Sequence, residues 1–135
     1  MNKPRFTFNT IGLFTRDNRA TVDFYTRTFG FSCDWDGVQP NVELFLGDMR
    51  IILFPREDFE KMTSQKFRYP EGFNGTMELA FDVPNYAAVD TEYENALANG
   101  AQSVIQPTTE PWGQRTSYVA DPDGNLIEIG SFVKE

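Results

Sequence analysis

The two halves of this chain repeat one pattern of strand and helix signals, and this repeat constrains the fold more than any other feature. Ile11 corresponds to Leu79 and Tyr25 corresponds to Tyr93, both at an offset of 68 residues. In each half a strand-like segment leads to a residue suited to cap a helix, and then to apolar residues at helical spacing. A repeat of this length predicts two copies of one supersecondary unit.

The same order of elements follows in both halves. Each half predicts a strand, then a helix, then three strands joined by turns rich in Gly, Pro and Asp. Asp17 and Asn85 are the expected helix N-caps, and Gly30 is expected to end the first helix. The first half predicts strands at 6–15, 31–36, 41–46 and 49–54 and a helix at 18–29. The second half predicts strands at 76–83, 101–106, 114–120 and 125–132 and a helix at 86–98, and a short helix is expected between the halves at 57–63.

These elements predict an α+β fold of two βαβββ modules. Three strands joined by short turns pair as an antiparallel meander, and each helix needs one face of a sheet to cover. We expect a single domain over residues 1–135, with module 1 at about 1–56, a linker at about 57–75 and module 2 at about 76–135. The mixed strands should form an open cup with the helices on its outer face, and a space inside curved sheets suits a small ligand.

Composition excludes several classes of function. The chain contains no histidine, which removes Ser–His and Cys–His catalysis and the commonest nitrogen ligand for zinc, nickel or iron. A net charge of -8 argues against nucleic acid as a partner. No apolar run is long enough for a membrane helix. The single cysteine, Cys33, cannot form an internal disulfide and favours a cytoplasmic location.

Several motifs in this order resemble the vicinal oxygen chelate superfamily, which includes glyoxalases, bleomycin resistance proteins and extradiol dioxygenases. The resemblance covers nearly the whole chain and implies the two-module fold inferred above. Its character is similar to that of the members that use no metal. The motifs are Ile11-Gly12-Leu13-Phe14-Thr15-Arg16-Asp17, Phe24-Tyr25, Phe29-Gly30-Phe31, Leu79-Ala80-Phe81-Asp82-Val83, Gly100-Ala101, Pro111-Trp112-Gly113-Gln114-Arg115 and Asp121-Pro122-Asp123-Gly124-Asn125-Leu126-Ile127-Glu128.

The resemblance also implies where a metal would bind. In metal-using members, four ligands come from the first and last strands of each module, and these positions map to Thr10, Ile52, Glu78 and Glu128. Thr10 is a poor ligand and Ile52 cannot coordinate. We therefore expect no cofactor, although a divalent cation held by the two glutamates and water stays an alternative.

Strand alternation places the two carboxylates on one face. Ile127 and Ile129 should face the helix, so Glu128 faces the cup, and the same logic applies to Glu78. We expect Glu78 and Glu128 to lie across from each other on neighbouring strands. Three interpretations stay open, namely a pair that is solvated or bonded to a nearby Arg or backbone amide, a site for a cationic ligand, or a metal site.

Other residues are expected on the inner face of the cup. Phe14 shares the face of Thr10, and Phe54 shares the face of Ile52, so half of the site should be apolar. Trp112 lies in the turn before the seventh strand and is expected to contact a ligand or to cover the sheet edge. Arg115 should pair with Glu110 or Asp121, or bind an anionic group. The predicted ligand-binding residues are Thr10, Phe14, Ile52, Phe54, Glu78, Trp112, Arg115 and Glu128, with no catalytic residue.

These observations favour a metal-independent binding protein similar to bleomycin resistance proteins, which would sequester a small aromatic or cationic compound as a cytoplasmic homodimer. An apolar half-site beside two carboxylates suits such a guest. The alternative is a metal-dependent lyase or isomerase of the glyoxalase type that uses Glu78 and Glu128. A third interpretation is an interaction domain with a vestigial pocket.

Overall fold

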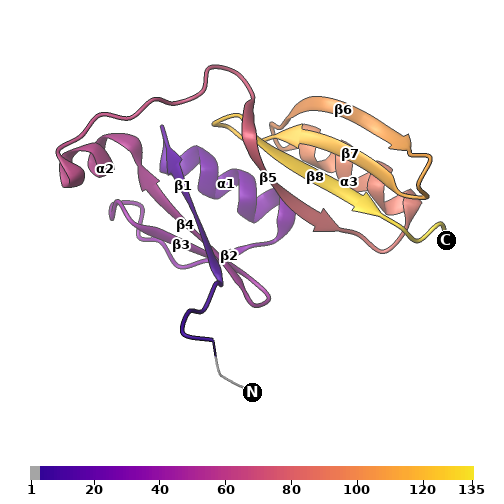
Figure 1. The fold of residues 1–135 in the computed structure, drawn as a ribbon, viewed down its shortest axis with the longest axis horizontal. Helices are drawn as coiled ribbons and strands as arrows, with labels where there is room; N and C mark the ends of the chain where they lie inside the picture. The colour runs from indigo at the N-terminus through magenta and orange to yellow at the C-terminus, as the bar shows by residue number, and fades with distance from the viewer. Residues whose placement is uncertain (1–3) are drawn as a thin grey trace. The chain divides into compact units, whose positions relative to one another are not determined.

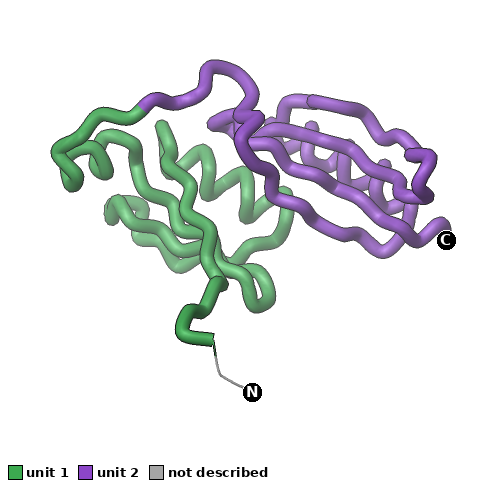
Figure 2. Tube along the Cα trace, viewed as in Figure 1, with its two compact units in different colours: residues 1–67 green, residues 68–135 purple. Residues whose placement is uncertain are grey.

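The computed structural model describes residues 4–135. The chain divides into two compact units, with unit 1 ending at Phe67 and unit 2 beginning at Arg68 (Figure 2). Each unit contains one four-stranded sheet and its own buried core. The α+β class and the two βαβββ modules predicted from the repeat are confirmed (Figure 1).

Unit 1 is a mixed sheet with a long helix on one face. Its elements are β1 (Thr10–Thr15), α1 (Asn18–Phe29), β2 (Ser32–Cys33), β3 (Val42–Leu46), β4 (Met49–Pro55) and α2 (Arg56–Thr63). The strand order is β1-β4-β3-β2. β1 runs parallel to β4, whereas the other neighbouring strands are antiparallel. The helix α1 packs on β2, β3 and β4, and α2 contacts β4 and β1.

Unit 2 repeats this topology without a helix after its last strand. Its elements are β5 (Asn74–Asp82), α3 (Tyr86–Ala98), β6 (Gln102–Thr109), β7 (Arg115–Ala120) and β8 (Asn125–Ser131). The order is β5-β8-β7-β6, with β5 parallel to β8 and the other pairs antiparallel. The helix α3 packs against β6, β7 and β8. No helix in residues 4–135 is long and apolar enough to cross a membrane.

Local signals explain where the two long helices begin. The Asp17 side chain accepts a hydrogen bond from the Arg19 amide at 3.0 Å, and the Asn85 side chain accepts one from the Ala88 amide at 2.9 Å. Both residues satisfy amides that have no partner inside the helix. Gly30 ends α1 in the left-handed conformation (φ 78°), as expected. The three predicted caps are therefore confirmed.

Alternation determines which side of each sheet is buried. In unit 1 the side facing α1 carries Leu13, Leu44 and Leu53, which are nearly inaccessible to solvent. In unit 2 the side facing α3 carries Ile127 and Ile129, which are equally buried. The opposite side of each sheet, which we call the open face, is the side that the sequence pattern assigned to ligand contacts.

Two predicted strands are longer than the observed ones by four residues each. The strand predicted at 6–15 begins only at Thr10, and Phe6 and Phe8 are exposed. The strand predicted at 31–36 is reduced to Ser32–Cys33. Asp36 explains the second difference, because its carboxylate accepts hydrogen bonds from the amides of Val38 and Gln39 and turns the chain away from the sheet.

Candidate functional site

The open face of unit 2 concentrates polar side chains on three neighbouring strands. β7 contributes Thr116 and Tyr118, β8 contributes Glu128 and β5 contributes Glu78. In the β7–β8 register Tyr118 lies opposite Glu128. Gly130, two residues after Glu128 on β8, lies opposite Thr116. As a glycine it places no side chain on the open face at this position of β8.

One oxygen of Glu128 is held by two hydroxyl groups. Glu128 Oε2 accepts a hydrogen bond from Tyr118 Oη at 2.9 Å and from Thr116 Oγ1 at 3.0 Å. Among residues 4–135, no group donates a hydrogen bond to the other oxygen, Oε1. This oxygen is also not among the buried polar atoms that lack a hydrogen-bond partner. The carboxylate is therefore fixed in orientation and retains an accessible acceptor on the open face.

Glu78 and Glu128 share the face but are not directly opposite. Glu78 pairs with Leu126, and Ala80 pairs with Glu128, so the prediction that the two glutamates lie across from each other is wrong by two residues. The cause is the parallel β5–β8 register. Tyr118 donates its hydrogen bond to Glu128, and the charge of Glu78 also acts on the Tyr118 phenol.

The Tyr118 phenol remains protonated because ionisation is unfavourable at this place. Partial burial raises the pKa of Tyr118 well above its ordinary value, and the hydrogen bond to Glu128 and the charges of Glu128 and Glu78 raise it further. A phenolate would add a third negative charge to this face. Tyr118 is therefore a hydrogen-bond donor at neutral pH, and the face has a net negative charge.

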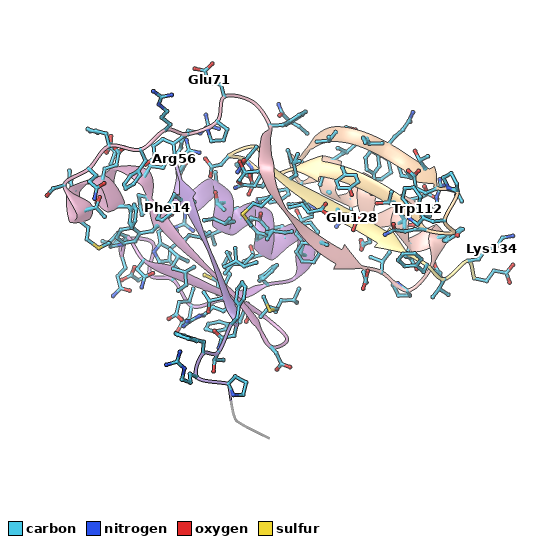
Figure 3. All side chains as sticks on the ribbon, viewed as in Figure 1. Phe14, Arg56, Glu71, Trp112, Glu128 and Lys134 are labelled. Atoms are coloured by element: carbon cyan, nitrogen blue, oxygen red, sulfur yellow. The ribbon has the colours of Figure 1, made fainter. Side chains whose placement is uncertain are left out.

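Trp112 lies at one end of this face, on the loop between β6 and β7 (Figure 3). Trp112 is 63% exposed, which excludes a place in the core. Its indole Nε1 donates a hydrogen bond to Gln114 Oε1 at 2.9 Å. The Gln114 amide nitrogen in turn lies 3.0 Å from the point where a Cβ of Gly130 would stand. Gln114 thus lies between the Trp112 ring and the polar side chains of β7 and β8.

Arg115 has a different partner from the predicted ones. Its guanidinium group binds the Asp90 carboxylate on α3 at 2.8 Å and Thr109 at 2.9 Å, rather than Glu110 or Asp121. The expected pairing is therefore wrong, because α3 passes beside the start of β7. Asp121 instead accepts hydrogen bonds from the amides of Asp123 and Asn125 in the β7–β8 turn. Arg115 ties the Trp112 loop to α3.

The open face of unit 1 is aromatic at one end. Phe14 and Phe54 are neighbours in the β1–β4 register, and Phe59 of α2 lies over both, with ring-centroid distances of 4.2 and 6.3 Å. Phe67 extends the group, 5.3 Å from Phe59. The prediction that Thr10, Phe14, Ile52 and Phe54 share one face agrees with the register of β1 and β4. Phe14 stays partly exposed.

Thr10, at the other end of the same face, lies beside a cation. Arg50 Nε donates a hydrogen bond to Thr10 Oγ1 at 3.0 Å, and its Nη1 forms an ion pair with Glu43 at 2.7 Å. The Thr10 hydroxyl itself donates to Asn9. Both the neighbouring guanidinium and the occupied hydroxyl make Thr10 unsuitable as a ligand for a positive ion.

The chemistry of the four mapped positions does not fit a divalent metal. Ile52 has no donor atom, Thr10 is bonded to Arg50, and one oxygen of Glu128 already accepts two hydrogen bonds. Within residues 4–135, no group of three or more His, Cys, Asp or Glu side chains is placed to hold a metal. Hard divalent ions need about six oxygen ligands, far more than these residues offer.

Sequence patterns identified part of this site and missed the rest. Glu78, Glu128 and Trp112 were predicted, whereas the three side chains that connect or hold them were not. Thr116 and Tyr118 alternate with the buried Ser117 and Val119, and this period of two was the signal that could have found them. The residues missed are Gln114, Thr116 and Tyr118.

Comparisons with known proteins agree with this architecture. The family model described as Glyoxalase/Bleomycin resistance protein/Dioxygenase superfamily matches residues 7–129. The uncharacterized protein YraH of Bacillus subtilis is 29% identical over 122 residues, which cover 88% of this chain and 93% of that protein.

Two solved structures illustrate the similarity. A glyoxalase/bleomycin resistance protein/dioxygenase family enzyme from Burkholderia phytofirmans is 28% identical, with a TM-score of 0.80 over 93% of this chain and 98% of that one. A lactoylglutathione lyase from Agrobacterium tumefaciens is 20% identical, with a TM-score of 0.71 over 95% of each chain. The second likeness concerns the fold alone.

Proposed function

Because the chain belongs to the Glyoxalase/Bleomycin resistance protein/Dioxygenase superfamily, we propose that it is a metal-independent binding protein that sequesters a small aromatic or cationic compound. The observation that carries this proposal is the open face of unit 2. There Glu128 retains an accessible oxygen, and Glu78 adds a second negative charge around the same phenol.

Charge and hydrogen bonding both favour a cationic guest. A carboxylate fixed by Thr116 and Tyr118 needs little reorganisation when it accepts an ammonium donor. Tyr118 stays neutral and therefore leaves the negative charge on the carboxylates. A protein with a net charge of -8 also attracts cations over a longer range.

Each unit by itself offers apolar surface to an aromatic guest. On unit 2, the exposed Trp112 ring and the half-exposed Ile105 side chain provide apolar surface. On unit 1, Phe14, Ile52 and Phe54 provide a second apolar surface, with Thr10 at its end. Arg115 contributes indirectly, since its guanidinium is bound to Asp90 and holds the Trp112 loop.

The wider proposal is that the protein acts as a cytoplasmic homodimer, in the manner of a resistance protein that lowers the free concentration of an antibiotic. Light scattering of the purified protein tests the dimer. A thermal-shift screen of cationic aromatic antibiotics tests the ligand class, because a ligand at 100 times its dissociation constant adds about 2.7 kcal/mol of stability.

Binding of phenethylamine, an aromatic monocation, tests the central proposal. We expect Glu128→Gln to weaken this binding about 10-fold or more, because hydrogen bonds to charged groups contribute roughly 1.5–3 kcal/mol. Glu43→Gln on unit 1 is the matched control and should leave the affinity unchanged. Phenethyl alcohol, which lacks the charge, should bind much more weakly. Equal binding of the amine to both variants and the unmodified protein would contradict the proposal.

The alternative function is a metal-dependent lyase or isomerase of the glyoxalase type. One observation favours it, namely the convergence of two carboxylates on Tyr118. Metal analysis separates it from the binding protein. A near-stoichiometric metal that is lost in the Glu78→Gln, Glu128→Gln double variant would favour the enzyme.

A further inference from the structure

We propose that Gln114 is a specificity-determining residue of the unit 2 open face, and that it selects guests with a hydrogen-bond acceptor beside their cationic group. This inference rests on the proposed function and narrows its ligand class to amines with a neighbouring oxygen. β-Amino alcohols and α-amino carbonyl compounds have this chemistry.

The orientation of the Gln114 amide follows from its partner. An indole N–H can only donate, so the atom of Gln114 that faces Trp112 Nε1 at 2.9 Å must be the carbonyl oxygen. The NH₂ group therefore points away from Trp112. Among residues 4–135, this NH₂ group donates a hydrogen bond to no acceptor. It is not one of the buried polar atoms that lack a partner, so it is open to solvent or to a ligand.

Gly130 creates the space in which this amide lies. A Cβ at position 130 would stand 3.0 Å from Gln114 Nε2 and 3.3 Å from the Arg115 carbonyl oxygen. These distances are shorter than ordinary van der Waals contacts, so any larger residue would displace the amide. The absence of a side chain at Gly130 lets the Gln114 amide approach β8 at this position.

Thr116 brings this donor next to the acceptor of Glu128. The Thr116 hydroxyl is 3.6 Å from the same Cβ point on Gly130 and donates to Glu128 Oε2 at 3.0 Å. The NH₂ group of Gln114 therefore lies near the same point above Gly130 as the Thr116 hydroxyl, which is bonded to Glu128. An ammonium group that meets Glu128 would place an oxygen on an adjacent atom within reach of Gln114.

The loop that carries Gln114 is fixed before any ligand binds. The Glu110 amide donates to the Gln114 carbonyl at 2.7 Å, and the Gly113 amide donates to the Glu110 carbonyl at 3.0 Å. The ion pair between Arg115 and Asp90 anchors the following residue to α3. A donor held in place loses little conformational freedom on binding, and this increases its contribution to selectivity.

Two amines that differ by one oxygen test the proposal. Phenylethanolamine carries a hydroxyl beside its aminomethyl group, and phenethylamine does not. Dissociation constants from ligand-detected NMR should be roughly 2- to 10-fold lower for phenylethanolamine, which is the range for one neutral hydrogen bond. Gln114→Leu should abolish this preference, so that the two amines bind with equal affinity. Gly130→Ala should weaken this preference, because its methyl group would shift the amide by a few tenths of an ångström.

Each outcome is decisive. Equal affinity for the two amines in the unmodified protein, with binding still lost in Glu128→Gln, would overturn the role of Gln114 and leave the proposed function intact. A parallel loss of both amines in Gln114→Leu would show that Gln114 only positions Trp112, and would also overturn it. If neither amine binds the unmodified protein, both proposals are overturned. Melting temperatures of the variants separate misfolding from loss of recognition.

Discussion

The two units share one topology but cover the open faces of their sheets differently. In unit 1, α2 places Phe59 over Phe14 and Phe54, so part of the face is used for packing. Within its described residues unit 2 has no helix after β8, and its open face carries Glu78, Tyr118 and Glu128. The helix-facing sides are alike, since both are buried and apolar. Because both units need an apolar side against their long helix, only the open face of each sheet can carry different functional side chains.

The turns that join the last two strands of each unit provide the largest predicted contrast. Gly124→Ala in unit 2 should lower the free energy of unfolding by roughly 2–5 kcal/mol. Its φ is 88°, and a Cβ there would clash with the Gly72 carbonyl oxygen. Gly47→Ala in unit 1 has a positive φ but open space, so about 1 kcal/mol is expected. Urea denaturation measures both, and equal losses would contradict the close approach at Gly124.

The aromatic cover of unit 1 predicts an intermediate effect. Phe59→Ala should cost about 1–3 kcal/mol of stability, less than a fully buried Phe, because Phe59 is half-buried but contacts three other rings. Met62→Ala, on the exposed side of the same helix, should cost under about 0.5 kcal/mol. Chemical denaturation followed by Trp35 fluorescence, in a Trp112→Phe background, measures the change in unit 1. Similar losses in the two variants would mean that α2 does not stabilise the open face.

The polar cover of unit 2 predicts a smaller effect that depends on pH. The pKa of Tyr118 is raised in the folded protein, so its stabilising contribution is complete below the ordinary tyrosine pKa of about 10 and is lost as the pH rises above that value. Stability of the unmodified protein should therefore fall more steeply than that of Tyr118→Phe, by at most about 1.4 kcal/mol per pH unit. Urea denaturation between pH 9 and 11 measures this, and parallel curves would exclude a raised pKa.

Local signals in the sequence were sufficient for most of the fold. The helix predicted at 86–98 is observed as Tyr86–Ala98, because Asn85 caps it and the apolar spacing is regular. The strand predicted at 31–36 was too long, since the Asp36 side chain competes for backbone amides at its end. Hydrophobic pattern does not register such competition, so strand ends were the least predictable part.

The sequence predicted the candidate site only where the alternation of side chains along a strand determines which face a residue occupies. The pattern of β8 placed Glu128 on the open face, and the register then placed Tyr118 opposite it. The parallel register of β5 on β8 leaves no mark in the sequence, so the offset of Glu78 was missed. The pairing of Arg115 with Asp90 depends on where α3 crosses the sheet, which no local spacing encodes.

The β7–β8 turn also affects how the protein ages chemically. Asp-Gly sequences slowly rearrange to isoaspartate when the glycine nitrogen attacks the aspartate side chain. Here the Gly124 amide donates to the Asp121 carbonyl at 2.9 Å, and Asp123 is buried. Attack would need this turn to open first. The rate of isoaspartate formation at Asp123–Gly124 is therefore controlled by how often this turn opens, rather than by the intrinsic reactivity of the dipeptide.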